Sequence, residues 1–350
     1  MKVLVILEEI RGNIVSFEER KSLWEEKLTQ DPGLSLEDIS FVREEDWMKE
    51  NQTGGRCYES VDAILGMKLK DGSLSEEFFR RYPKVKYVAT FNHGFGNYDR
   101  EAVKRHGVTV RNTVYGDVTV AQFAMGLLLN ICHGITENRH FYKEEHFCES
   151  RMENHTDPGA GKETQKVKAK NPAPVTRQIE LYKKTLGVIG LGSIGLWTAR
   201  MAAGFGMRIL AYSPHPKTGK AYDFIEQTSL EEVLRNSDVI SLHCPLTEET
   251  RGLINAETIS MMKDGVILIN TARGDIIVEK DLADALRSRK IYAAGLDVVS
   301  GEPLAEKTEI FDCENAYITP HMAWLSKEAV YRQVEIAAEN LRDYLIDSLC

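Results

Sequence analysis

The stretch from Thr185 to Gly195 constrains the fold of this chain more than any other part of its sequence. It reads Thr-Leu-Gly-Val-Ile-Gly-Leu-Gly-Ser-Ile-Gly, an apolar run that ends in closely spaced glycines. Apolar residues then recur at helical intervals, and a second apolar run follows at 209–212. This order of strand, glycine turn, helix and strand is the context in which a G-x-G-x-x-G sequence binds a dinucleotide.

The glycines of this motif have separate physical tasks. Gly190 permits a tight turn, Gly192 lets the backbone approach a pyrophosphate, and Gly195 lets the helix pack closely on the strand. The N-terminus of the helix, at Ser193 and Ile194, offers N–H groups and a positive dipole end to the phosphates. These five residues are therefore predicted to bind a cofactor, the alternative being a glycine-rich turn of a parallel sheet without a ligand.

The second strand lacks the acid that normally completes this motif. An Asp or Glu about twenty residues after the motif binds the ribose hydroxyls of NAD, and here that place is taken by Ser213. A carboxylate at this position would repel the 2′-phosphate of NADP, and Ser213 removes that repulsion. We expect NADP to be tolerated or preferred, with His215 or Lys217 near the phosphate, and the choice between NAD and NADP stays open.

Length and composition exclude several classes of protein. A chain of 350 residues suggests two domains, and its net charge of −9 argues against a nucleic-acid-binding surface. No stretch has the apolar length of a membrane span, and the start of the chain predicts a strand rather than a signal peptide. We expect no nucleic-acid and no membrane partner.

The cysteines indicate a reducing compartment. All six, at 57, 132, 148, 244, 313 and 350, are scattered without paired metal spacing, which is typical of reduced thiols in a cytoplasmic protein. Cys148 lies near His140, His146 and His155 in the sequence, but these spacings match no standard zinc site. No metal is expected.

The first 113 residues alternate short apolar runs with charged amphipathic stretches. Candidate strands lie at 2–7, 40–42, 63–66, 85–90 and 109–111, and this alternation predicts an open parallel α/β sheet. The glycine-rich stretch Asn92–Asp99 follows the fourth of them, at the carboxyl edge where such sheets bind ligands. Its backbone N–H groups suit a carboxylate, although the loop alone fits an ordinary connecting turn equally well.

The middle of the chain changes character twice. Residues 118–135 are nearly all apolar or small, which predicts a helix buried on most of its surface. Residues 136–178 are charged and contain several prolines and glycines, so we expect an exposed, mobile connection.

After the glycine motif, successive strands end in residues that can carry chemistry. The carboxyl ends of parallel strands lie along one edge of the sheet, over the cofactor crevice. The residues at these ends are Ser213, Cys244, Pro245, Thr271, Ala272, Arg273, Asp297, Glu302 and His321.

Three of these residues suit acid–base chemistry beside a nicotinamide. His321 can take or give a proton near neutral pH, and Glu302 would favour its imidazolium form if the two were hydrogen-bonded. Arg273 offers a planar set of donors for a carboxylate or a polarised carbonyl oxygen. Each residue alone fits a structural role, but their common place on one sheet edge favours a catalytic one.

Together these motifs resemble the D-isomer-specific 2-hydroxyacid dehydrogenases. The resemblance runs from about Val85 to the C-terminal helix, and within the family it is greatest to the glycerate dehydrogenase (hydroxypyruvate reductase) branch. It is carried by residues 185–195, 241–247, 270–274, 295–298 with Glu302-Pro303, and 319–321, and for the branch by residues 112–135 and 319–324.

The resemblance implies an α/β fold of two doubly wound parallel-sheet domains. Residues 1–117 and 322–350 would form a flavodoxin-like substrate-binding domain, into which a Rossmann dinucleotide domain of residues 118–321 is inserted. Dimerisation through the dinucleotide domain would be usual, so a homodimer is expected. The segment 143–178 is longer and more polar than the linker of the family.

The resemblance also implies roles for individual residues. His321 would be the acid/base, Glu302 its partner, and Arg273 a contact of the substrate and the cofactor, while Asp297 would lie by the nicotinamide. The other implied contacts are Asn92, His93 and Gly94 on the substrate carboxylate, and Cys244, Pro245, Thr271, Ala272, His321 and Ala323 on the cofactor.

The predicted function is therefore an NAD(P)-dependent reduction of a small 2-keto acid of the hydroxypyruvate or glyoxylate type. A dinucleotide-sensing binding protein, like the corepressor relatives of the family, is one alternative, because those proteins retain the Arg, Glu and His. A phosphoglycerate dehydrogenase is the other.

Overall fold

The computed structural model describes residues 1–10, 12, 14–30, 34–52, 58–91, 98–143, 149–156, 163–170, 176–304 and 306–347. They form two compact units. Unit 1 comprises Met1–Thr119 and Trp324–Cys350, and unit 2 comprises Val120–Ala323. The sequence predicts that the chain crosses between domains after residues 117 and 321; in the structure it crosses two residues later at each place.

Unit 1 is built on a five-stranded parallel sheet. Its order, β2-β1-β3-β4-β5, is the flavodoxin-like order of a doubly wound sheet. The central strands are continuous apolar runs and are buried along their whole length, as strands covered on both faces must be. The strands are β1 (Val3–Leu7), β2 (Ile39–Arg43), β3 (Ala63–Met67), β4 (Tyr87–Thr90) and β5 (Thr109–Asn112).

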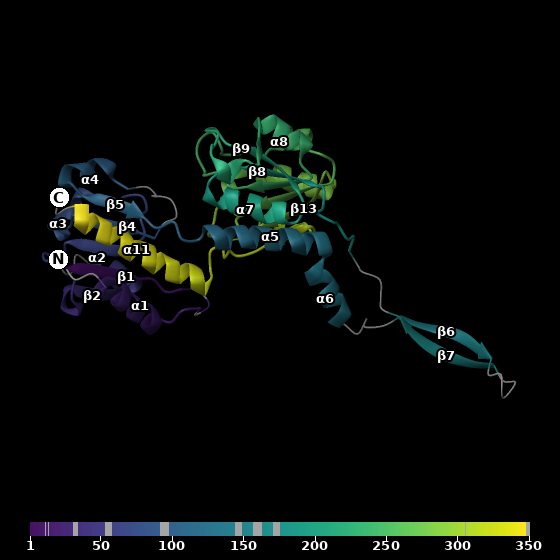
Figure 1. Ribbon diagram of the computed structural model, residues 1–350, viewed down its shortest axis with the longest axis horizontal. Helices are drawn as coiled ribbons and strands as arrows, with labels where there is room; N and C mark the ends of the chain where they lie inside the picture. The colour runs from purple at the N-terminus through teal and green to yellow at the C-terminus, as the bar shows by residue number, and fades with distance from the viewer. Residues whose placement is uncertain are drawn as a thin grey trace. The chain divides into compact units, whose positions relative to one another are not determined.

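Helices cover both faces of this sheet. One face packs against α1 (Phe17–Thr29) and the C-terminal α11 (Lys327–Asp347), which lie side by side (Figure 1). The other face packs against α3 (Glu76–Arg81) and α4 (Arg100–His106), with Trp47 of α2 (Glu44–Gln52) at the margin of that core. The C-terminal helix therefore completes the fold of the N-terminal segment.

Unit 2 contains a seven-stranded parallel sheet in the order β10-β9-β8-β11-β12-β13-β14. The first six positions reproduce the dinucleotide-binding order, with a reversal of strand order between β8 and β11. The strands are β8 (Thr185–Ile189), β9 (Arg208–Tyr212), β10 (Glu226–Gln227), β11 (Val239–Leu242), β12 (Val266–Asn270), β13 (Ile291–Leu296) and β14 (Ala316–Ile318).

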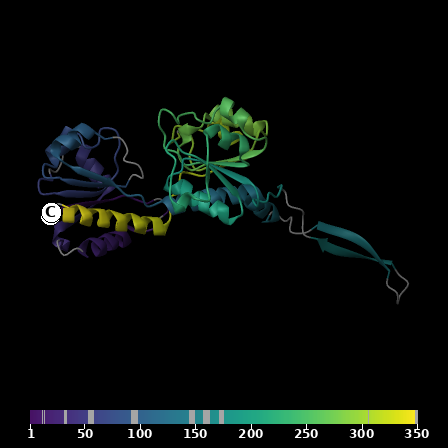
Figure 2. The same ribbon diagram turned by 45° about the horizontal axis from the view of Figure 1, so that its top comes forward.

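The helices of unit 2 again form two layers. α5 (Asp117–His133) and α7 (Ser193–Gly204) pack on one face of the sheet. The other face is covered by α8 (Leu230–Asn236), α9 (Ala256–Met261) and α10 (Glu279–Arg287). Figure 2 shows the sheet between these layers in a second view. The two doubly wound sheets confirm the predicted fold class.

The predicted apolar helix is α5, and its apolar residues lie in the core of unit 2. Among the described residues, no single helix is long and apolar enough to cross a membrane; α5 and α6 (Ile135–Lys143) meet that criterion only as a pair bent by 56°. The packing of α5 on the sheet accounts for its composition.

The segment 136–178, predicted to be an exposed, mobile connection, contains regular elements that the sequence did not predict. It contains α6 and an antiparallel hairpin of β6 (Glu149–Thr156) and β7 (Glu163–Lys170). The antiparallel backbone register pairs residue 149 with residue 170 and residue 156 with residue 163. The sequence predicts no strands here because no apolar alternation marks them.

Candidate active site

The glycine motif has the geometry that a dinucleotide requires. Gly190 directly follows β8 and has a φ of +100°, and a Cβ there would lie 2.4 Å from the backbone nitrogen of Cys244. A Cβ at Gly195 would lie 2.2 Å from the carbonyl oxygen of Gly190, so only glycine lets α7 approach the strand this closely. A Cβ at Gly192 would meet no atom within 4 Å, so its surroundings are open on the side where a pyrophosphate would approach.

The start of α7 suits an anion. Gly192 is the N-cap residue, the first turn contains no acidic side chain, and Ser193 and Ile194 are its first residues. The first N–H groups of a helix have no partner within the helix, and the dipole makes this end positive. Together with the open side of Gly192, this end of α7 fits the phosphates of a nicotinamide dinucleotide.

The end of β9 lacks the Asp or Glu that normally binds the ribose hydroxyls of NAD. Ser213 follows the strand, and the stretch from Arg208 to Tyr222 contains neither Asp nor Glu. The backbone of Lys217 is fixed by Gln227 of β10, whose side-chain oxygen accepts from the Lys217 N–H at 2.8 Å and whose amide donates to the Lys217 carbonyl at 2.7 Å. His215 is exposed. A fixed basic loop therefore occupies the place of the usual carboxylate.

Cys244 and Pro245 follow β11, the strand next to β8. Burial raises the pKa of the Cys244 thiol to about 11, so this residue is a neutral packing group at pH 7. Directly after the next strand, β12, the hydroxyl oxygen of Thr271 is buried and has no hydrogen-bond partner among the described residues. An unpaired buried hydroxyl at this edge is consistent with a polar ligand in the crevice.

The turn after β12 presents Arg273. The buried Asn270 shapes this turn, since its amide donates to the Arg273 carbonyl at 2.9 Å and its oxygen accepts from the Ala272 N–H at 3.0 Å. The guanidinium donates to the Ala272 carbonyl at 2.6 Å, and the residue is exposed. The remaining guanidinium donors make no hydrogen bond within the described part of the chain, so they are available to a carboxylate.

Glu302 and His321 form a hydrogen-bonded pair, which is the condition under which Glu302 would favour the imidazolium form of His321. Glu302 Oε2 lies 2.8 Å from His321 Nδ1, and Glu302 Oε1 accepts from the Val299 N–H at 2.7 Å. The His321 side chain is 44% exposed. With Nδ1 engaged by the carboxylate, Nε2 is the nitrogen left to exchange a proton with a ligand.

Asp297 holds the turn that carries His321. One carboxylate oxygen accepts from the Thr319 hydroxyl at 2.6 Å and the Met322 N–H at 2.9 Å, and the other accepts from the Ala323 N–H at 2.7 Å. Burial raises the pKa of this carboxyl, although these hydrogen bonds and the nearby His321 oppose the shift. Asp297 and Ala323, predicted as cofactor contacts, are thus hydrogen-bonded to each other.

Some functional residues lie outside these predictions. Asn270, Asp275 and Thr319 shape the turns of Arg273 and His321. Asn270 and Thr319 lie within motifs that carry the family resemblance, whereas the only sequence signal of Asp275 is its place two residues after Arg273. The substrate contacts predicted at Asn92, His93 and Gly94 lie outside the described residues. No group of metal-ligating side chains occurs among the residues the structure describes.

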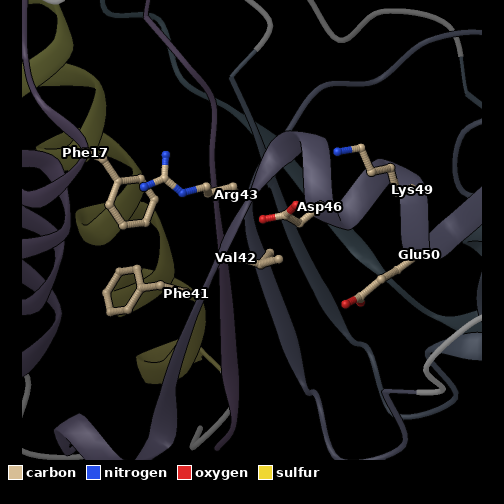
Figure 3. Close-up of a pocket in the computed structure, with 7 residues that line it drawn as sticks. All are labelled: Phe17, Phe41, Val42, Arg43, Asp46, Lys49 and Glu50. Carbon is tan, nitrogen blue, oxygen red and sulfur yellow. The ribbon is translucent and has the colours of Figure 1, made fainter.

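A separate hollow of about 500 Å³ lies in unit 1 beside the edge strand β2 (Figure 3). Phe17, Phe41 and Arg43 lie on one side of that strand, and the Arg43 guanidinium stacks on the Phe17 ring at 4.2 Å. None of the predicted site residues lines it. The other residues that line it are Val42, Asp46, Lys49 and Glu50.

Comparison with known proteins identifies similar sequences and folds. Residues 125–323 match the family model of the D-isomer specific 2-hydroxyacid dehydrogenase NAD binding domain. The chain is 39% identical to a hydroxypyruvate reductase of Blautia hydrogenotrophica over 273 residues, which cover 78% of this chain and 79% of that protein. It is 37% identical to a glyoxylate reductase of Pyrococcus furiosus over 286 residues, covering 81% and 79%. A solved D-lactate dehydrogenase from Treponema pallidum superposes with a TM-score of 0.74 at 25% identity, covering 99% and 97% of the two chains.

Proposed function

The chain belongs to the D-isomer-specific 2-hydroxyacid dehydrogenase family, and we propose that it reduces a small 2-keto acid of the hydroxypyruvate or glyoxylate type. Members of this family are oxidoreductases that act on a CH–OH group with a nicotinamide dinucleotide. The observation that carries the proposal is the Glu302–His321 pair at 2.8 Å, at the sheet edge that also carries the glycine motif.

In the proposed mechanism, each side chain has one task. Arg273 binds the substrate carboxylate or carbonyl oxygen through its unused donors. A bound nicotinamide supplies the hydride that reduces the carbonyl carbon. His321 donates a proton from Nε2 to the oxygen as negative charge develops there, and Glu302 stabilises the protonated ring through Nδ1. The N–H groups at His93 and Gly94 would hold the substrate carboxylate.

For the cofactor, the proposal is NADP, or NADP together with NAD. The absence of acidic residues between Arg208 and Tyr222 supports it, because a carboxylate at this place would repel the 2′-phosphate. The fixed Lys217 loop, with His215, supplies basic groups near that position. A Ser213→Asp variant restores the repulsion and is expected to move the preference toward NADH.

A homodimer formed through unit 2 is also part of the proposal. Several large apolar side chains of this unit are exposed, among them Ile135 at 55%, Tyr182 at 58% and Phe205 at 44%. Tyr182 and Phe205 also line a hollow of about 430 Å³ together with Leu129 and Ile179. Exposed apolar groups gathered around a hollow favour a protein partner.

The reaction is tested by a substrate panel run with each cofactor. Purified protein is mixed with hydroxypyruvate, glyoxylate, pyruvate and a branched 2-keto acid, with NADH or NADPH, and the nicotinamide absorbance is followed. We expect the largest kcat/KM for hydroxypyruvate or glyoxylate, with NADPH used at least as well as NADH.

Two results of this panel would contradict the proposal. A hundredfold preference for NADH would overturn the cofactor assignment while leaving the reaction intact. No turnover on any substrate, combined with tight dinucleotide binding, would favour a dinucleotide-sensing protein. Adding phosphohydroxypyruvate to the panel separates the phosphoglycerate dehydrogenase alternative, which requires that substrate to be preferred.

A further inference from the structure

We propose that Asp275 is a positioning residue that fixes Arg273 relative to the Glu302–His321 pair. The inference rests on the proposed function, in which Arg273 holds the substrate and His321 donates the proton. It concerns a carboxylate that touches neither of these side chains and acts through the loops that carry them.

Asp275 joins three consecutive loops at the carboxyl edge of the unit 2 sheet. It lies in a short 3₁₀ turn (Gly274–Ile276) that follows β12 and begins directly after Arg273. One carboxylate oxygen accepts from the Arg251 guanidinium at 2.9 Å, in the loop after β11. The other accepts from the Ser300 hydroxyl, in the loop after β13. The Asp275 backbone carbonyl also accepts from the Gly252 N–H at 2.9 Å.

Ser300, which contacts Asp275, lies in the same short loop as Glu302 of the catalytic pair. Ser300 follows Val299, whose N–H donates to Glu302 Oε1, and the other oxygen of Glu302 meets His321. Gly274 packs directly against this loop, because a Cβ on it would lie 2.0 Å from the carbonyl carbon of Val299. The loop that orients Glu302 therefore rests on the turn that carries Arg273.

The fold does not depend on this carboxylate. β12 and β13 are held by their own ladder, which pairs Val266–Asn270 with Ile291–Leu296, and the underlying core is buried. The Asp275 and Arg251 side chains are 34% and 53% exposed, and exposed ion pairs contribute little to stability. Catalysis is more sensitive than stability here, because a displacement of about 1 Å in a positioned group can cost up to a hundredfold in rate.

The chain offers a matched control. Asp264 pairs with Lys290 at 2.7 Å at the start of β12, so it lies at the opposite edge of the same sheet. The Asp264→Asn change removes the same charge from an ion pair just before β12, without touching the loops of the site after it. A Ser300→Ala variant removes the hydrogen bond from the Ser300 hydroxyl to Asp275. It therefore tests the connection between the two loops without altering charge.

The test compares Asp275→Asn, Ser300→Ala and Asp264→Asn for kcat, dinucleotide Kd and the pH dependence of kcat in keto-acid reduction. We expect Asp275→Asn to lower kcat by about tenfold with an unchanged Kd, and Ser300→Ala to act in the same direction more weakly. The pH profile of kcat should change in both, because Glu302 no longer holds the His321 ring in the same place. Asp264→Asn should match wild type.

NMR of the histidine rings separates failure of this inference from failure of the proposed function. The His321 signal is assigned by its loss in His321→Gln, and no substrate is present. Asp275→Asn should move the ring signals of His321, because Glu302 is displaced, whereas Asp264→Asn should not. If Asp275→Asn and Asp264→Asn both match wild type in kcat, pH profile and ring signals, the inference is overturned. A protein whose His321 signals move but which reduces no keto acid would overturn the proposed function instead.

Discussion

His321 combines its proposed proton transfer with an unusual backbone conformation. Its φ is +52°, in the left-handed region that side chains other than glycine rarely adopt. Asp297 compensates by accepting hydrogen bonds on both sides of this residue, from Thr319 and from Met322 and Ala323. Strain of this kind costs about 1–3 kcal/mol and persists only where neighbours enforce it. The acid/base is thus held in one orientation by a buried carboxylate.

His243 gives a pH-dependence prediction at the residue scale. It follows β11, its ring Nε2 lies 2.9 Å from the Ser241 hydroxyl oxygen, and burial lowers its pKa to about 4 from an ordinary value of 6.5. Between these pH values the unfolded chain binds a proton that the folded chain does not. The free energy of unfolding should therefore fall as pH falls from 6.5 to 4, by about 1.4 kcal/mol per unit, with no contribution above that window.

Urea unfolding at several pH values measures this effect. The His243→Gln variant carries no titratable ring, so its unfolding free energy should decline less steeply over the same pH window. Equal slopes in the variant and wild type would show that His243 is not the group responsible.

Individual site residues differed in how far the sequence could predict them. Arg273, Glu302 and His321 each come within four residues after an apolar run, so the parallel-sheet rule places them at one edge without any structure. The hydrogen bonds of Asp297 could not be predicted, because they depend on how the chain turns after β14. The same holds for Asp275, whose partners lie 24 and 25 residues away in sequence.

At the scale of elements, the start of α7 is the part of the cofactor site most sensitive to substitution. Gly195→Ala places a methyl group 2.2 Å from the Gly190 carbonyl oxygen, so α7 must move away from β8. Overpacking of this kind costs about 1–3 kcal/mol. We expect a lower melting temperature and at least tenfold weaker dinucleotide binding, measured by thermal unfolding and by titration calorimetry.

The same helix provides the control for this prediction. A Cβ at Gly204, the last residue of α7, would meet no atom within 4 Å. Gly204→Ala should leave dinucleotide affinity unchanged and stability unchanged or slightly higher, since alanine restricts the unfolded chain. If both variants bind the dinucleotide like wild type, the close approach of α7 to β8 does not form the phosphate site.

Elements with strong apolar patterns could be predicted, and polar ones could not. The strands of both sheets and α5 are apolar because they are buried, and burial is what the pattern reports. The hairpin of β6 and β7 has no such pattern, since its strands are almost entirely polar. α6 has no fully buried residue, and its polar sequence gave no sign of where it begins or ends.

At the scale of the whole molecule, the parallel α/β architecture followed from the sequence. Repeated strand–helix units require right-handed crossovers and a parallel sheet, and the glycine motif identifies which sheet carries the cofactor. The N-terminal unit is completed by α11, more than two hundred residues beyond its last strand, β5 (Thr109–Asn112). That discontinuity followed from family resemblance, since local patterns do not show which distant segments pack together.

The oligomeric state is the prediction at this scale. The chain has a mass of 39.6 kDa, and light scattering should give twice that value if unit 2 forms a homodimer. Phe205→Asp and Tyr182→Asp place a charge among exposed apolar side chains and should shift the protein toward the monomer. Leu36→Asp, at a 60% exposed position in unit 1, is the control and should remain dimeric. A monomeric wild-type protein would contradict the proposed interface.

The central claim is that His321 protonates the substrate oxygen, and the His321→Gln variant tests it most directly. Glutamine keeps a polar side chain but cannot transfer the proton, so kcat for hydroxypyruvate or glyoxylate reduction should fall by about a hundredfold or more. Dinucleotide Kd, measured in parallel, should stay within about twofold of wild type, because the glycine motif and the Lys217 loop are unchanged. A variant that keeps near-normal kcat would contradict the account.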